Sequence, residues 1–328
     1  MNFYVTIAGE PPTISILKKE FPNIEYIPLK GYRIKYPKNG MFFVLKIISQ
    51  IPKILRAIYN ENRWIKTQLK DRRWDLIISD NRYGLYTEKT KTVFITHQIH
   101  IISGFGNIPD TLLQRIVYNK INKFNMCWIP DVQDEIYNIG GKLSHPIEKP
   151  HHTKFIGPLS RLEIISTQAN GPILILLSGP EPQRTVFENI LLKQLNRIQN
   201  EKIIFVRGLP ESTTKIKDEL DVEFINFIDV NSLSKIMSEA SLVICRSGYS
   251  TIMDLIKLNK KALLIPTPGQ SEQLYLAHHL QEMHRFIARS QETVSLAEDI
   301  KTCRNSSTTM LKVDFAEYKN ALREIVEL

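Results

Sequence analysis

The residue pattern with the clearest chemical use follows the apolar run Leu242–Cys245, where a turn of small and polar residues leads into a helical segment. A strand that ends in such a turn presents unpaired backbone N–H groups and the positive end of a helix dipole. This arrangement is typical of a phosphate-binding site. Asp254 lies one turn into the helix, where its carboxylate can accept hydrogen bonds from a diol such as ribose. The residues of the turn are Arg246, Ser247, Gly248, Tyr249, Ser250 and Thr251.

In the alternative interpretation, Ser250 only caps the helix and Asp254 only favours its amino end. Polar turns also follow two other apolar runs in this half of the chain. Parallel sheets bind ligands at the carboxyl ends of their strands, so the three turns together predict one crevice. The candidate residues in the two further turns are Ser178, Gly179, Gln270, Glu272 and Gln273.

Short apolar runs alternate with segments of helical period along most of the chain, which predicts parallel sheets with crossover helices and therefore an α/β fold. Runs such as Ile173–Leu177 show no polar alternation, which suits strands covered on both faces. In the first half the predicted strands are Phe3–Ala8, Ile24–Pro28, Leu76–Ser79, Thr92–Thr96 and Met126–Pro130. In the second half they are Ile173–Leu177, Ile203–Arg207, Glu223–Phe227, Leu242–Cys245 and Ala262–Pro266.

The segment between Gly140 and Pro172 is rich in proline and has little periodicity, which predicts a boundary between two lobes. We expect a first lobe over residues 1–155, a second lobe over 156–312 and a terminal segment over 313–328. The last segment has apolar residues at helical spacing from Phe315 to Ile325, so we expect a helix that packs across both lobes.

The 328 residues include 43 Lys and Arg against 34 Asp and Glu, and the whole excess lies in the first lobe. Residues 29–73 are strongly basic, which favours an anionic partner such as a membrane surface or a phosphorylated substrate. Within them, residues 41–59 are amphipathic with Phe42 and Phe43 at the start, and Pro52 is expected to break or kink the helix. The segment is either a core-facing helix with a solvated basic face or a surface that lies on anionic lipid.

Trp64 and Trp74 alternate with basic residues in this stretch. Aromatic rings can stack on bases and basic side chains can bind phosphates, so a nucleic acid is an alternative partner. No compact recognition module accompanies them, so we expect no nucleic acid. The three cysteines are far apart in the sequence, so we expect reduced thiols in a cytosolic protein. We find no signal peptide and no apolar run long enough to span a membrane. The histidines lack metal-ligand spacing, so we expect no metal site and no bound cofactor.

The second lobe resembles the donor-binding half of the MurG-type UDP-N-acetylglucosamine transferases of glycosyltransferase family 28, through Arg246–Gly248, Thr251, Asp254 and Pro266–Gln273. The resemblance continues more faintly into Ser79–Gly84 and Thr96–Gln98. These enzymes have the GT-B fold, in which two Rossmann-like lobes with parallel sheets face a central cleft. The resemblance therefore implies a metal-independent transferase that uses a UDP-sugar.

The resemblance also implies roles for single residues. Asp254 would bind the ribose hydroxyls, Gln273 would contact the donor, and the backbone at Ile228 would read uracil. Arg161 would pair with the diphosphate, which would also meet the helix start at Ser250 and Thr251. Ser178 and Gly179 would lie near the sugar and the phosphates.

Two features depart from the family pattern. The turn at Ser178–Glu181 is not a run of glycines. In addition, Phe3–Gly9 resembles the family's second strand, so these 328 residues lack the first strand, its glycine-rich turn and its helix. Either the start codon is misassigned or the protein lacks that catalytic loop. The candidate bases for an inverting transfer are then His97 and Asp80, each at the end of a predicted strand. The alternative for His97 is a structural histidine whose ring is satisfied by backbone groups.

Together these features predict transfer of a hexosamine, N-acetylglucosamine by the resemblance, from a UDP-sugar to a lipid-linked or glycan acceptor at the inner face of the membrane. A non-catalytic UDP-sugar-binding protein or partner subunit remains an alternative, because the first catalytic loop has no counterpart. A nucleotide-sugar epimerase on the same fold is a further one.

Overall fold

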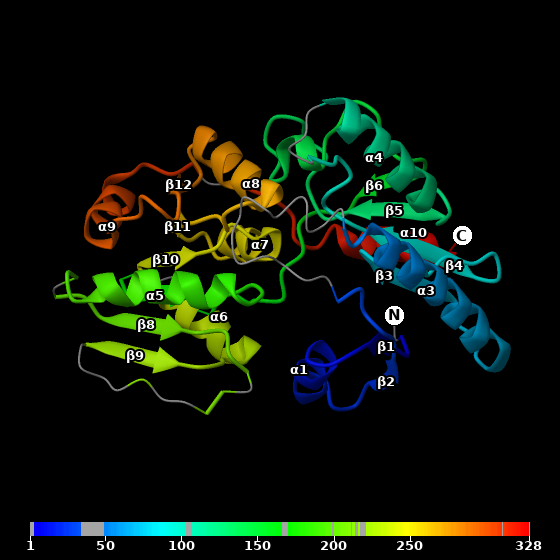
Figure 1. Cartoon of the computed structure of the whole chain (residues 1–328), viewed down its shortest axis with the longest axis horizontal. Helices are drawn as coiled ribbons and strands as arrows, with labels where there is room; N and C mark the ends of the chain where they lie inside the picture. The colour runs from blue at the N-terminus through cyan, green and yellow to red at the C-terminus, as the bar shows by residue number, and fades with distance from the viewer. Residues whose placement is uncertain are drawn as a thin grey trace.

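A computed structural model describes residues 3–33, 49–102, 107–165, 170–198, 200–210, 212–213, 216, 221–309 and 311–327. The described residues form two α/β lobes, which lie side by side in Figure 1. A four-stranded parallel sheet forms the centre of the first lobe, and a six-stranded parallel sheet forms the centre of the second.

The first lobe contains two separate parallel sheets in the part of the chain that the structure describes. One pairs β1 (Thr6–Gly9) with β2 (Glu25–Pro28), which α1 (Thr13–Glu20) connects. The other has the order β3-β4-β5-β6 and is accompanied by α3 (Ile51–Asp71) and α4 (Asn107–Ile121). Its strands are β3 (Leu76–Asp80), β4 (Lys91–Ile95), β5 (Met126–Ile129) and β6 (Thr153–Phe155).

The second lobe has the strand order β12-β11-β10-β7-β8-β9, and all its strands are parallel. The chain builds outward from β7 through β8 and β9, then returns to the other side of β7 for β10. The direction of winding therefore reverses between β7 and β10, and open α/β sheets bind ligands at such a point. The strands are β7 (Ile173–Leu176), β8 (Ile203–Val206), β9 (Val222–Ile225), β10 (Leu242–Cys245), β11 (Ala262–Leu264) and β12 (Ile287–Ala288).

Helices cover both faces of this sheet because its strands are apolar on both sides. Residues such as Leu174 and Val243 pack into one buried cluster, whereas their neighbours Ile175 and Ile244 pack into another on the opposite face. The helices are α5 (Gln183–Leu195), α6 (Val230–Glu239), α7 (Tyr249–Lys257), α8 (Ser271–Glu282) and α9 (Leu296–Asn305).

The ten predicted strands all have counterparts in the structure, although several ends differ by one to three residues. The sequence analysis missed β6 and β12. The three residues of β6 pair with β5 inside the segment that we interpreted as an aperiodic boundary, and β12 has only two residues. Strands this short leave no periodic pattern, so only pairing with a neighbour defines them.

The terminal helix α10 (Tyr318–Glu327) returns to the first lobe, where Figure 1 shows it against the four-stranded sheet. Its residues Ala321 and Ile325 are buried with Val93 and Trp128 of that sheet. The segment before it reaches the second lobe, because the ammonium group of Lys257 lies 5.7 Å from the centre of the Phe315 ring. The end of the chain therefore contacts both lobes.

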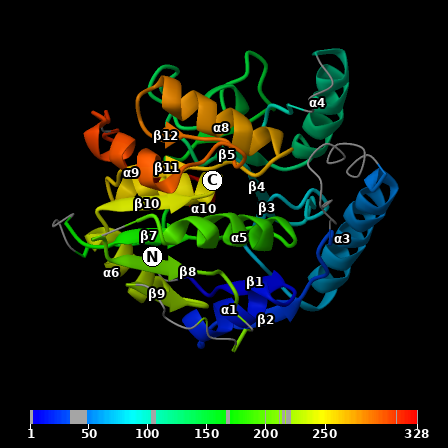
Figure 2. The same ribbon diagram turned by 60° about the vertical axis from the view of Figure 1, so that its left-hand side comes forward.

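Helix α3 starts at Ile51 with Pro52 in its first turn, directly after a turn at residues 49–50. The described helix does not run through Pro52 from before, and the prediction that Pro52 breaks or kinks the 41–59 segment stays a prediction for residues 41–48. Proline is tolerated there because the N–H of a first-turn residue has no partner inside the helix. Part of the predicted amphipathic segment, including Phe42 and Phe43, lies outside the described residues. Figure 2 shows α3 along the outer side of the first lobe.

The buried carboxylate of Glu61 ties α3 to the loop after β3. It accepts hydrogen bonds from Tyr32 Oη at 3.0 Å, Arg82 Nε at 2.9 Å and the Gly84 N–H at 3.0 Å. Burial raises the pKa of Glu61, while the Arg82 charge acts to lower it. The loop between β3 and β4 packs so closely on α3 that residue 84 has no room for a side chain.

We expect Gly84→Ala to lower the free energy of unfolding by about 3 kcal/mol, because a Cβ there would lie 2.3 Å from the Ile58 carbonyl oxygen and 2.5 Å from Glu61 Cβ. Urea unfolding measures the change. The matched control is Gly248→Ala, whose Cβ would have no neighbour within 4 Å, and which should cost at most about 1 kcal/mol from the N-cap preference for glycine. Equal unfolding midpoints for the two variants would contradict the packing argument.

Candidate functional site

The amino end of α7 lies directly after β10 and is open to a ligand. Gly248 is its N-cap, and no side chain caps the first turn. A Cβ at Gly248 would meet no atom within 4 Å, and Ser250 in the first turn is exposed. The first backbone N–H groups of α7 therefore point from a fixed helix end toward open space, as an anion site requires.

A second glycine faces open space on the neighbouring strand. Gly179 follows β7, which pairs with β10, and a Cβ there would also meet nothing within 4 Å. Its φ of +101° is a conformation that side chains rarely adopt. Ser178 beside it is exposed. The two turns thus flank the point where the winding of the sheet reverses, and each has a glycine next to open space.

Asp254 lies one turn into α7 and is half-buried. Its Oδ1 accepts a hydrogen bond from Ser160 Oγ at 2.6 Å, and the described residues supply no donor to Oδ2. Burial raises the pKa of Asp254, whereas Ser160, Arg161 and Lys257 act to lower it. One carboxylate oxygen is thus held by the segment that joins the lobes, and the other remains for a ligand.

Arg161 belongs to the same connecting segment, and its side chain is 56% exposed. Its Nη1 lies 2.8 Å from Glu20 Oε2 of α1, so an ion pair joins the connecting segment to the first lobe. Lys257 of α7 donates to the Ser160 carbonyl oxygen at 3.1 Å and fixes the backbone next to Arg161. An exposed ion pair of this kind exchanges partners at little cost.

Arg246 does not face the open space, although the sequence analysis placed it among the donor ligands. Only 1% of its surface is exposed, and its guanidinium lies 3.9 Å from the centre of the Phe187 ring. Burial lowers its pKa to about 10. Its hydrogen bonds go to the carbonyl oxygens of Ile265, Pro266 and Gln183 and to Gln291 Oε1. Arg246 therefore holds the strand ends together beneath the site.

The turn after β11 is tied to the start of α7. Ser247 is buried, and its Oγ donates to the Gln273 carbonyl oxygen at 2.8 Å. Gln273 Oε1 accepts the Thr267 N–H at 2.9 Å, so at least half of this amide side chain fixes its own loop. Gln270 is the N-cap of α8 and is partly exposed, and its side chain does not cap the helix. Ser247 and Gln273 thus make side-chain hydrogen bonds within these loops, whereas the Gln270 side chain does not cap its own helix.

Ile228 lies in the loop between β9 and α6 and packs against the apolar cluster that contains Ile252 and Leu255 of α7. The next residue, Asp229, caps α6 by accepting the N–H groups of Asn231 and Ser232, both at 3.0 Å. The backbone at Ile228 is thus fixed between a helix cap and a packed side chain. Thr251, also proposed as a donor contact, is partly buried in the first turn of α7.

His97 follows β4 in the first lobe but is held by the second. Its Nε2 lies 2.9 Å from Glu272 Oε1 of α8, and its ring stacks on Tyr249 of α7 with centres 4.1 Å apart and planes 8° from parallel. The alternative interpretation was that backbone groups bind the His97 ring. In the structure, a side chain, that of Glu272, binds Nε2. Glu272, proposed as a donor contact, is instead engaged by His97.

Asp80 ends β3, the strand next to β4, and lies near enough for the charge of His97 to act on it. Its surroundings raise its pKa by desolvation, and His97 acts to lower it, although the carboxylate still reaches solvent. The structure thus brings the two candidate bases together at the carboxyl edge of the first sheet.

The loop after β5 also reaches the second lobe. Tyr249 is almost fully buried, and its Oη donates to the Pro130 carbonyl oxygen at 2.9 Å. Asp131 stiffens this loop because its buried carboxylate accepts the N–H groups of Ile139 and Gly140 and the hydroxyl of Ser144. The loops after β4 and β5 therefore contact the helices that begin at the donor-side turns.

Sequence reasoning missed three residues that complete this arrangement. Ser160 binds Asp254, Glu20 binds Arg161, and Tyr249 supports His97. Tyr249 lies within the turn that we singled out, but its type gave no sign of a contact across the lobes. Ser160 and Glu20 lie 94 and 141 residues from their partners, so no local pattern marks them.

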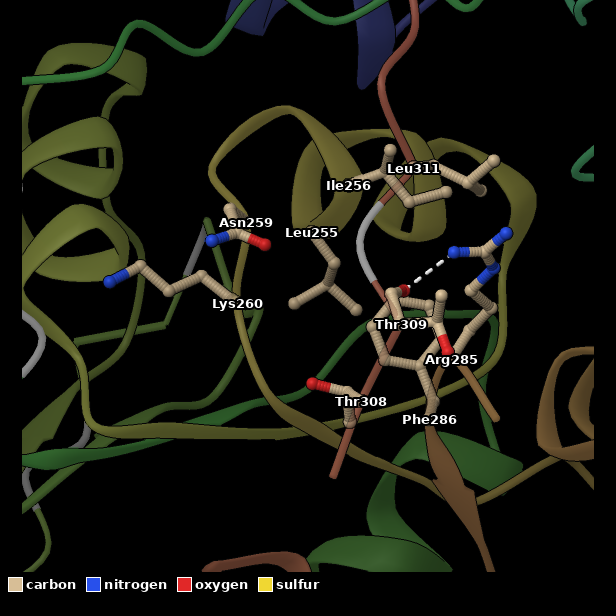
Figure 3. Close-up of a pocket in the computed structure, with 9 residues that line it drawn as sticks. All are labelled: Leu255, Ile256, Asn259, Lys260, Arg285, Phe286, Thr308, Thr309 and Leu311. Atoms are coloured by element: carbon tan, nitrogen blue, oxygen red, sulfur yellow. Dashed lines mark hydrogen bonds between the residues drawn. The ribbon is translucent and has the colours of Figure 1, made fainter. Parts of the chain in front are cut away.

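Two hollows lie away from these loops. One of about 20 Å³ lies at the carboxyl end of α7, where Arg285 donates to the Thr309 carbonyl oxygen at 2.6 Å (Figure 3). That volume holds about one water molecule. A wider one of about 590 Å³ lies at the amino ends of β3 and β4, lined by Arg73, Trp74 and Lys89 among others. Within the described residues, no group of three His, Cys, Asp or Glu side chains is placed to hold a metal ion.

Comparison with known proteins shows what this chain is similar to. Residues 184–328 match the glycosyltransferase family 28 C-terminal domain. The UDP-N-acetylglucosamine--N-acetylmuramyl-(pentapeptide) pyrophosphoryl-undecaprenol N-acetylglucosamine transferase of Clostridium botulinum (strain Hall) is 23% identical over 264 residues, which cover 79% of this chain and 68% of that protein. The enzyme of the same name from Prochlorococcus marinus is 25% identical over 265 residues, or 75% of this chain and 64% of that protein.

Solved structures agree on the fold. The glycotransferase of kitacinnamycin superposes with a TM-score of 0.61 at 13% identity and covers 98% of this chain and 87% of its own. MurG of Acinetobacter baumannii gives a TM-score of 0.55 at 16% identity, covering 98% of this chain and 90% of its own. The glycosyltransferase VinC, solved in complex with dTDP, gives 0.54 at 12% identity, covering 98% and 87%.

The protein thus has the GT-B fold of two parallel-sheet lobes, as the sequence predicted. Its residues 184–328 are similar to the C-terminal domain of glycosyltransferase family 28, and 264 of its residues align at 23% identity with a MurG-type transferase.

We expect Arg246→Lys to lower the free energy of unfolding by about 2–4 kcal/mol, because an ammonium group cannot reach the four acceptors that the planar guanidinium joins. Urea unfolding followed by circular dichroism measures the loss. The control is Arg161→Lys, which changes an exposed arginine on the segment that joins the lobes and should alter stability by less than about 0.5 kcal/mol. Wild-type stability in the Arg246 variant would contradict a structural role for this residue.

Proposed function

We propose that this protein transfers a hexosamine, N-acetylglucosamine, from a UDP-sugar to a lipid-linked or glycan acceptor at a membrane surface. One observation carries the proposal. Two glycines on neighbouring strands, Gly179 and Gly248, face open space at the reversal point of the second sheet, beside a helix end that no side chain caps. The family 28 domain supports a sugar-nucleotide ligand for this space, and the names of the relatives specify UDP-N-acetylglucosamine.

The diphosphate would lie against the first turn of α7, where the backbone N–H groups at Ser250 and Thr251 and the helix dipole favour negative charge. Arg161 lies on the same side of α7, since its charge acts on Asp254. It would exchange Glu20 for the diphosphate when the donor binds. These groups stabilise the charge that builds on the departing UDP.

The nucleoside would lie between Asp254 and the loop at Ile228. The Oδ2 atom of Asp254 is an acceptor suited to ribose hydroxyls, and fixed backbone groups at Ile228 are suited to the edge of uracil. Gln270 and the remaining amide group of Gln273 would contact the sugar end of the donor. Ser178 would lie on the opposite side of the phosphates.

The acceptor would approach from the first lobe, where His97 and Asp80 end neighbouring strands. An inverting transfer needs a base within hydrogen-bond reach of the acceptor hydroxyl. His97 suits that role, because both lobes fix its ring and Asp80 lies near to stabilise it once protonated.

We expect Gly248→Ala and Asp254→Asn each to weaken UDP binding at least tenfold. The first places a methyl group where the phosphates approach the backbone, and the second removes the charge that strengthens a hydrogen bond to ribose. Isothermal titration with UDP measures both, and UDP release from UDP-N-acetylglucosamine with an acceptor measures turnover. Wild-type affinity in both variants would refute the donor site. UDP binding without turnover would favour the non-catalytic alternative.

The membrane part of the proposal rests on α3. Its side chains Ile51, Leu55 and Tyr59 recur every four residues and are 38%, 49% and 63% exposed. The basic residues Lys53, Arg56, Arg63 and Lys66 are exposed on the same helix. Lys35, Lys38 and Lys46 of the basic stretch lie outside the described residues. No helix of the described residues is long and apolar enough to cross a bilayer, so contact through this face of α3 would be peripheral.

We expect Leu55→Asp to reduce binding to vesicles of anionic phospholipid about tenfold or more, because it removes an exposed apolar side chain that the bilayer would cover and adds a charge that the lipid headgroups repel. Sedimentation with vesicles at two salt concentrations measures the effect. The control is Ile164→Asp, which changes a side chain 62% exposed on the segment that joins the lobes. Equal loss in the two variants, or none in either, would contradict docking through α3.

A further inference from the structure

The contact between His97 and Glu272 crosses from one lobe to the other. His97 belongs to the loop after β4, whereas Glu272 lies in the first turn of α8. The side chains of His97 and Glu272 are 19% and 32% exposed, so each is shielded on most sides yet reachable from solvent. The hydroxyl of Ser271, next to Glu272, donates to the Ile102 carbonyl oxygen at 2.7 Å and joins the same two segments. The pair is therefore fixed by a second contact between the lobes.

The geometry determines which ring nitrogen is free. Glu272 Oε1 lies 2.9 Å from Nε2, and a carboxylate only accepts hydrogen bonds, so Nε2 carries the proton. In the neutral ring Nδ1 is then an acceptor, and the described residues offer it no partner. Three groups face the ring: the Glu272 carboxylate from α8, the Asp80 carboxylate from the end of β3 and the uncharged Tyr249 ring from α7.

We propose that Glu272 is a positioning residue for the base: it holds His97 with Nδ1 unprotonated and directed at the acceptor hydroxyl. This inference rests on the proposed function. In the transfer, the acceptor hydroxyl proton moves to Nδ1, the acceptor oxygen bonds to the anomeric carbon, and the bond from that carbon to the phosphate oxygen breaks. The electron pair leaves with UDP, and the proton on His97 returns to solvent.

Glu272 acts in two separable ways, as an acceptor that sets the tautomer and as a negative charge that stabilises the protonated ring. Because the two residues lie on different lobes, the base is complete only while the lobes are in contact. A transferase built in this way deprotonates its acceptor in the closed arrangement and not in an open one. Glu272 therefore makes deprotonation of the acceptor depend on contact between the lobes. Donor binding, which we assign to α7, does not depend on Glu272.

The test separates the acceptor from the charge with two substitutions. Glu272→Gln keeps an oxygen that accepts the Nε2 proton but removes the charge. We expect kcat about tenfold lower and KM for UDP-N-acetylglucosamine within about twofold, because the positive charge that builds on the ring during proton transfer loses its carboxylate partner. Glu272→Ala removes the acceptor as well, and we expect kcat about a hundredfold lower. Glu272→Asp should recover part of the loss.

A measurement that needs no turnover completes the test. Nitrogen chemical shifts of His97 in the full chain should show the proton on Nε2 in the wild type and in Glu272→Gln, and a mixture of tautomers in Glu272→Ala. The matched control is Glu282→Gln on the same helix, which removes the charge from an exposed pair with His278, 3.2 Å from its Nδ1, and should leave kcat unchanged.

The outcomes keep the two proposals apart. An unchanged tautomer and an unchanged kcat in Glu272→Ala would overturn the role of Glu272 while leaving a working transferase. Absence of UDP binding and turnover in the wild type would overturn the proposed function, and the nitrogen shifts would still report whether Glu272 sets the tautomer of His97. A mixed tautomer already present in the wild type would overturn the inference by itself.

Discussion

The buried guanidinium of Arg246 is the interaction on which the loops at the carboxyl edge of the second sheet depend. It joins carbonyl groups that follow β11, the start of α5 and a side chain that follows β12. Parallel strands end at one edge of a sheet, but nothing in the strand pairing itself fixes the turns beyond that edge. A planar cation with several donors can fix them together. The glycine turns at Gly179 and Gly248 can then stay open, since their positions do not rely on packing by side chains of their own.

The two lobes meet through polar contacts made by loops and helix starts. His97 stacks on Tyr249 and binds Glu272, Tyr249 binds the Pro130 carbonyl, and Ser160 binds Asp254. These contacts are exchangeable, because each has a hydrogen bond or an ion pair that water or a ligand can replace. The terminal segment adds a further connection, because Phe315 lies near Lys257 of the second lobe and α10 packs on the four-stranded sheet of the first.

Sequence patterns predicted the fold better than the site. All ten predicted strands exist, because buried parallel strands are apolar without alternation and are therefore visible in the sequence. Arg246 shows where this reasoning stops. Its position in a polar turn is typical of a residue that binds a ligand. Its side chain instead points inward, to the Phe187 ring and four oxygen acceptors. Residue type and spacing place a residue at the edge of a sheet, but neighbouring elements decide which way its side chain points.

The sequence by itself determined that this chain has two α/β lobes, that the second carries a small-residue turn before a helix with Asp254 one turn later, and that basic charge gathers on the first lobe. These features follow from residue type and from the spacing of apolar residues along the chain, which are local properties of the sequence. Only the tertiary structure decided that Glu272 meets His97 and that Ser160 meets Asp254, pairs separated by 175 and 94 residues. Such contacts depend on how two separately folded sheets are oriented, and no local pattern encodes that orientation.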